Sequence, residues 1–170
     1  MAAPTDGPDD STPAAIHHIV LGTDLGEASA AAEATAIDMA ARLHSQLLVV
    51  NVIDPGGLRL PGGRFGPRLD QVRAEREASV SRIVARARDA GVTARFLVWH
   101  GEPGPGLLET AAAEGADLIV VGSHRRNRLG RLLLGSVSTH VIEHADRPVI
   151  VARGDEVLRY ESRPADAGAG

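Results

Sequence analysis

The stretch from Gln46 to Ile53 has the sequence QLLVVNVI. A continuous run of aliphatic and β-branched side chains is typical of a strand that is buried on both faces. Such strands occur in parallel sheets, because the crossover connections of these sheets place helices on each side. The run therefore predicts a central strand of a parallel α/β sheet.

Strand and helix patterns alternate on both sides of this run. Further strands are predicted at 17–24, 94–99, 117–122 and 148–152, and helices at 27–43, 69–89, 104–114 and 136–144. Strict alternation implies parallel strands joined by right-handed crossovers. We expect an open, doubly wound, parallel five-stranded sheet. Between 54 and 67 the chain (DPGGLRLPGGRFGP) carries so much proline and glycine that no regular structure is expected.

The chain of 170 residues has the usual length of one domain. We expect a disordered tail at 1–15, the domain at 16–153 and a flexible tail at 154–170. The first residues have neither a basic region nor an apolar region, so they do not resemble a signal peptide. No apolar run approaches the length of a membrane span. The protein is expected to be cytoplasmic, with no membrane partner.

Composition excludes several kinds of chemistry. There is no cysteine, so disulfides, thiolate metal sites and cysteine nucleophiles are excluded. All 18 basic residues are arginine, which excludes a Schiff-base lysine and the lysine of a Walker loop. The formal net charge of −4 and the 2% of aromatic residues argue against a nucleic acid partner.

Polar residues and glycines lie at the ends of three predicted strands, at Thr23–Asp24, at Asp54 and at Gly122–Ser123–His124. In doubly wound sheets ligands bind beyond the carboxyl ends of the strands. The segment after Gly122 is the richest of the three. Its glycines at 122, 130 and 135 permit close approach of the backbone to a ligand, which a Cβ would prevent.

Gly135, Ser136, Val137 and Ser138 open the helix that follows. Free amides at a helix start favour a phosphate, and the two serine hydroxyls can add donors. The alternative is that Gly135–Ser136 is only an N-cap. The arginines between 125 and 131 lie between two phosphate-suited glycines, although they also suit a solvated loop.

His140 to His144 fits the H-x-x-E-H pattern of some zinc peptidases. A zinc site also needs a third ligand and a catalytic cavity. Nothing after His144 offers an obvious acidic partner helix, and histidines near a helix C-terminus are favoured by the helix dipole. We expect no metal site here.

Several segments together resemble the universal stress protein family. They are HHIVLGTDLGEAS, LLVVNVID and VVGSHRRNRLGRLLLGSVSTHVIEHADRPVIVAR, and the resemblance covers about 17–153. It implies a flavodoxin-like sheet, also described as adenine nucleotide alpha hydrolase-like, with strand order 3-2-1-4-5. It also implies a frequent dimer, and ATP as the ligand in one branch of the family.

That branch carries a glycine, two residues, a second glycine, nine residues, and then glycine with serine or threonine. Gly122 matches the first glycine and Gly135–Ser136 the last pair, whereas Arg125 stands where the middle glycine would be. Arginine there either hinders the bound conformation or pairs with phosphate oxygens. The same resemblance places Asp24 near ribose and adenine, and a backbone group of Val52 at the adenine edge. Asp24 also suits an N-cap of the first helix.

The predicted nucleotide-binding residues are Gly22, Thr23, Asp24, Val52, Gly122, Ser123, His124, Arg125, Gly135, Ser136, Val137 and Ser138. The expected ligand is ATP, with or without Mg²⁺, and cyclic AMP is the alternative. We expect a regulatory stress-response module that senses the nucleotide, and no catalytic residues. The alternatives are an interaction protein that has lost the nucleotide, and a slow ATPase. The last strand, PVIVA, is a plausible sheet edge, so a homodimer through this strand is predicted.

Overall fold

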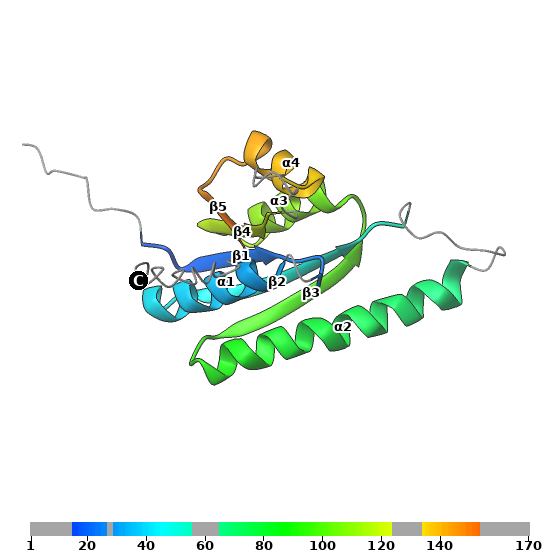
Figure 1. The fold of residues 1–170 in the computed structure, drawn as a ribbon, viewed down its shortest axis with the longest axis horizontal. Helices are drawn as coiled ribbons and strands as arrows, with labels where there is room; N and C mark the ends of the chain where they lie inside the picture. Colours follow the sequence, from blue (N-terminus) through cyan, green and yellow to red (C-terminus); the bar gives the residue numbers. More distant parts are fainter. Residues whose placement is uncertain (1–14, 27–28, 56–64, 124–133, 154–170) are drawn as a thin grey trace, which may run out of the picture.

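The computed structural model describes residues 15–26, 29–55, 65–123 and 134–153. The described chain alternates strands and helices (Figure 1). The elements are β1 (His18–Gly22), α1 (Ala30–Leu43), β2 (Gln46–Ile53), α2 (Phe65–Asp89), β3 (Ala94–His100), α3 (Pro103–Ala113), β4 (Leu118–Gly122), α4 (Ser136–His144) and β5 (Val149–Ala152). The alternation predicted from the sequence is confirmed.

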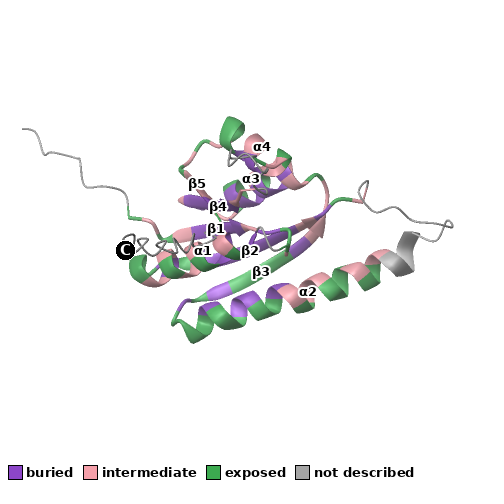
Figure 2. Ribbon diagram, in the orientation of Figure 1, coloured by how far each residue is buried: buried purple, intermediate pink, exposed green. Residues whose placement is uncertain are grey.

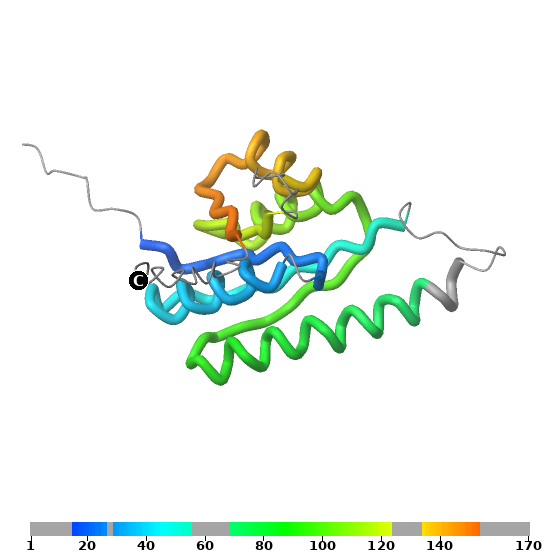
Figure 3. The backbone as a smooth tube through the Cα atoms, viewed as in Figure 1, coloured from blue at the N-terminus to red at the C-terminus, as the bar shows by residue number. Residues whose placement is uncertain are grey.

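The strands form one parallel sheet in the order β3-β2-β1-β4-β5. The chain winds outward from β1 through β2 to β3, and then returns through α3 to β4 on the other side of β1 (Figure 3). The winding direction therefore reverses between β1 and β4. In open α/β sheets, this switch point is where a crevice forms at the carboxyl ends of the strands. The predicted sheet and its strand order are confirmed.

Two apolar layers hold the helices on the sheet. Helices α1 and α2 cover one face, with Ala32, Ala36 and Val80 in a cluster with alternate residues of the strands. Helices α3 and α4 cover the other face through a second cluster that includes Leu107 and Val141. Burial is concentrated in the strands and on the inner sides of the helices (Figure 2). Among the described helices, none combines the length and the hydrophobicity that a membrane span requires.

The start of α2 differs from the prediction. The helix begins at Phe65, four residues before the predicted start. The prediction of irregular structure is therefore wrong for residues 65–67. Pro67 stands in the first turn, where a backbone N–H has no partner within the helix and proline is tolerated. For the same reason, α3 accepts Pro103 as its first residue.

The predicted helix ends at two glycines are confirmed by their backbone angles. Gly91 after α2 has a φ of +80° and Gly115 after α3 has a φ of +59°. The left-handed conformation that ends a helix costs glycine little because it has no Cβ. These two turns lie at the opposite end of the strands from Gly22 and Gly122.

Candidate functional site

A cleft of about 260 Å³ opens where β1 and β4 end. Its inner walls are apolar and come from three elements: Val50 and Val52 of β2, Val121 of β4, and Leu107 of α3. Its polar lining includes Thr23, Asp24 and Ser29 on one side, and Ser123 and Ser136 on the other. A small apolar slot with a polar rim is the usual form of a small-molecule site.

Gly22 lets β1 and α3 come close enough to form the slot. A Cβ built on Gly22 would lie 2.5 Å from Cδ2 of Leu107 and 3.3 Å from Cγ1 of Val121. Any larger residue would therefore have to displace the Leu107 side chain, which is buried. This is the close approach at a strand end for which glycine is suited.

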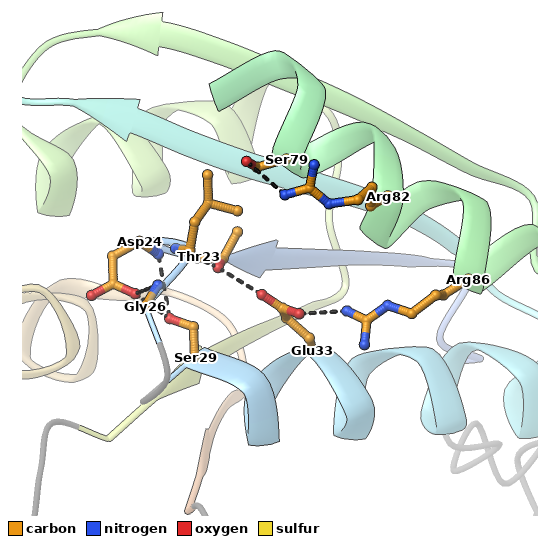
Figure 4. Close-up of polar contacts among 9 residues, drawn as sticks. Thr23, Asp24, Gly26, Ser29, Glu33, Ser79, Arg82 and Arg86 are labelled. Carbon is orange, nitrogen blue, oxygen red and sulfur yellow. Dashed lines mark hydrogen bonds and ion pairs between the residues drawn. The ribbon is translucent and has the colours of Figure 1, made fainter. Parts of the chain in front are cut away.

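The turn between β1 and α1 is fixed by hydrogen bonds. The Thr23 N–H donates to the Val50 carbonyl at 3.0 Å, and Asn51 Nδ2 donates to the Thr23 carbonyl at 2.8 Å. Asp24 Oδ1 accepts from the Gly26 N–H at 2.8 Å and from Ser29 Oγ at 2.6 Å (Figure 4). Because Ser29 is the N-cap residue of α1, the alternative that Asp24 caps this helix is wrong. The carboxylate instead closes the turn beside the cleft.

The turn between β4 and α4 carries the second set of predicted residues. Gly135 is the N-cap residue of α4 and has an extended backbone conformation. No side chain at this position caps the helix. Ser138, buried in the first turn of α4, donates its hydroxyl to the Gly122 carbonyl at 2.6 Å. This bond joins the end of β4 to the start of α4. The positive end of the α4 dipole therefore lies at the cleft.

The structure brings the predicted residues together. All predicted site residues in the described ranges line this cleft: Gly22, Thr23, Asp24, Val52, Gly122, Ser123, Gly135, Ser136, Val137 and Ser138. His124 and Arg125 lie outside the described residues. The sequence did not indicate Ser29, Val50, Pro103, Leu107 or Val121, which also line the cleft.

The H-x-x-E-H segment has a packing role in the described structure. The His140 and His144 rings stack with their centroids 4.2 Å apart. His140 also packs on the start of α3, since a Cβ on Gly104 would lie 2.7 Å from its Cδ2. Within the described residues, no group of three or more His, Asp or Glu side chains is arranged to hold a metal ion.

Fold and cleft together define a doubly wound α/β domain with a cleft at the switch point of its sheet. The chain belongs to the universal stress protein family, whose model matches residues 15–153. This assignment agrees with the resemblance seen in the strand-end segments.

Known relatives support the assignment. A universal stress protein of Methanocaldococcus jannaschii is 30% identical over 137 residues, which is 79% of this chain and 81% of that protein. One of Mycobacterium tuberculosis is 36% identical over 138 residues, again 79% of this chain. The matched region covers only 45% of that longer protein, so this chain spans about half the length of the relative.

Solved structures show the same fold. Universal stress protein UspA from Lactobacillus plantarum superimposes with a TM-score of 0.71 at 24% identity, covering 82% of this chain and 99% of that one. A universal stress protein crystallised in complex with cAMP superimposes with a TM-score of 0.61 at 26% identity, covering 82% and 98%.

Proposed function

We propose that this protein binds an adenine nucleotide in the cleft and acts as a regulatory stress-response module, with ATP as the main ligand. The observation that carries the proposal is that one cleft joins an apolar slot to the start of α4. A flat base suits the slot, and a phosphate suits the free amides of a helix N-terminus. The relative in complex with cAMP supports an adenine nucleotide as the ligand class.

The lining suggests the orientation of the nucleotide. The base would lie between Val52 and Leu107, with the backbone of Val52 at its edge. The ribose would lie near the Asp24 carboxylate, which the Gly26 N–H and the Ser29 hydroxyl hold in place. The phosphates would then extend toward Gly135 and Ser136, with or without Mg²⁺.

Isothermal titration calorimetry tests this function. ATP with Mg²⁺, cyclic AMP, AMP and adenosine are titrated separately into the protein, and GTP serves as the base-specificity control. We expect saturable binding of ATP, at least tenfold weaker binding of adenosine because it lacks phosphate contacts, and no binding of GTP. Absence of heat with every adenine compound at millimolar concentration would contradict the proposal.

We also propose that the protein forms a homodimer through β5. This strand lies at an edge of the sheet, and its Val149, Ile150 and Val151 are only half-buried. The Pro148 and Ala152 carbonyls accept hydrogen bonds from β4, so the alternate residues Val149 and Val151 direct their backbone groups to the open edge. Pairing with a second β5 would satisfy these groups.

A further inference from the structure

Glu33 is a buried carboxylate on the apolar face of α1. It is only 8% exposed and lies one residue after Ala32, which packs in the core. Glutamate is rarely buried unless it has partners. Its Oε1 accepts from Thr23 Oγ1 at 3.2 Å, and its Oε2 is 2.5 Å from Arg86 Nη2 of α2 (Figure 4). Both carboxylate oxygens are therefore engaged.

Thr23 connects this carboxylate to the cleft. Its hydroxyl donates to Glu33 and accepts the Leu25 N–H at 3.0 Å. Leu25 has a φ of +64°, a left-handed conformation that a side chain makes costly. The Thr23 hydroxyl thus holds the strained residue that follows Asp24 in the turn.

The chemistry of the carboxylate sets the direction of these bonds. A hydroxyl has one proton to donate, and an ionised carboxylate can only accept. Glu33 therefore fixes the Thr23 proton toward α1 and leaves the oxygen lone pairs for the Leu25 N–H. Without an acceptor at position 33, the hydroxyl could rotate and the turn would lose this restraint.

We propose that Glu33 is a positioning residue for the ligand site, with Arg86 as its counterion. It holds Thr23, and through Thr23 the turn that carries Asp24, in the conformation that lines the cleft. The effect on ligand affinity rests on the proposed nucleotide binding, whereas the effect on the turn does not.

The same contacts join α2 to the cleft. Besides the ion pair of Arg86 with Glu33, Arg76 Nη1 donates to the Asp24 carbonyl at 2.7 Å. Arg82, between them on α2, instead donates to Ser79 of its own helix at 3.1 Å (Figure 4). A shift of α2 would therefore alter the turn through Arg76 and Arg86, but not through Arg82.

The first test replaces Glu33 by leucine, which suits a buried site and removes the acceptor. Arg86 can remain solvated, because its side chain is 55% exposed. We expect amide hydrogen exchange at Leu25, measured without nucleotide, to accelerate at least tenfold. The dissociation constant for ATP should rise about tenfold while the Tm stays within a few degrees. Glu33→Gln keeps an acceptor at this position, so its Leu25 exchange rate and its dissociation constant for ATP should both lie close to those of the wild type.

A second pair of variants covers the case in which Glu33→Leu does not fold. Arg86→Gln should accelerate Leu25 exchange several-fold, and Arg82→Gln, which removes the same charge from the same helix, should not. Wild-type exchange at Leu25 in Glu33→Leu would overturn the positioning role, and where Glu33→Leu does not fold, wild-type exchange in Arg86→Gln would overturn it. Failure of the wild-type protein to bind ATP would instead overturn the proposed function, since the exchange measurement needs no ligand.

Discussion

Gly22 shows how a single residue shapes the cleft. The Cβ of an alanine there would lie 2.5 Å from Cδ2 of the buried Leu107, which itself lines the cleft. Gly22→Ala should push Leu107 toward the ligand space. We expect the free energy of unfolding to fall by about 1–3 kcal/mol, as for other overpacked cores, and ATP binding to weaken. Urea unfolding and calorimetry measure the two effects.

Gly101→Ala is the matched control for this variant. A Cβ on Gly101 would make an ordinary contact with the Trp99 ring, 3.6 Å from Cζ3. Its stability should stay within about 1 kcal/mol of the wild type, since glycine-to-alanine changes at compatible sites have small effects. Equal stability and equal affinity in the two variants would show that Gly22 has no special packing role.

The site residues differ in how well the sequence reveals them. Thr23, Asp24 and Gly122 are evident because polar residues and glycine directly follow apolar strands. Leu107 was missed because it reaches the cleft from α3, and its apolar side chain looks in the sequence like any other core residue of a helix. Glu33 was missed because its partner Arg86 is 53 positions away, so no local pattern distinguishes it from a solvent-facing glutamate.

At the scale of elements, Asp117 joins the starts of β1 and β4. Its Oδ2 accepts the N–H groups of His17 and His18 at 2.8 and 2.9 Å. These two backbone hydrogen bonds hold the pKa of Asp117 below its usual value of 3.8, and the bond from His18 has the larger effect. The carboxylate therefore links the starts of two strands that are far apart in sequence.

This contact predicts a dependence of stability on pH. A carboxyl group whose pKa is lowered by folding stabilises the fold above its unfolded-state pKa, and that contribution is lost as pH falls through the folded-state pKa. The wild type should therefore lose stability below about pH 4, and Asp117→Asn should lose less over the same range. Urea unfolding between pH 7 and pH 2.5 measures both slopes. Parallel curves would contradict the assignment.

The elements themselves were largely predictable because their signals are local. Buried strands such as β2 appear as apolar runs, and Gly91 and Gly115 mark helix ends. The start of α2 was not predictable, because Gly66 and Pro67 suggest a loop unless they are known to occupy a first turn. Proline is tolerated in the first turn of a helix and disrupts the interior, because only interior N–H groups have partners within the helix. The sequence alone does not show which of the two positions Pro67 occupies.

At the scale of the whole molecule, the open sheet leaves β5 at one edge. Val151→Pro should disrupt a dimer formed there, because it removes a backbone N–H that faces the edge while the bonds to β4 remain. Light scattering after size exclusion should give a dimer for the wild type and for Val151→Thr at micromolar concentration, and a monomer for Val151→Pro. A monomeric wild type, or a dimeric Val151→Pro, would contradict the proposed interface.

We propose that the cleft at the switch point of this sheet holds an adenine nucleotide. The most direct test is a ¹⁵N-resolved NMR titration of the protein with ATP and Mg²⁺. We predict saturable amide shift changes at Gly22, Thr23, Gly122 and Ser136, with Gly91 and Gly115 at the far end of the strands unchanged. No saturable change at millimolar ATP, or changes confined to residues outside the cleft, would contradict the claim.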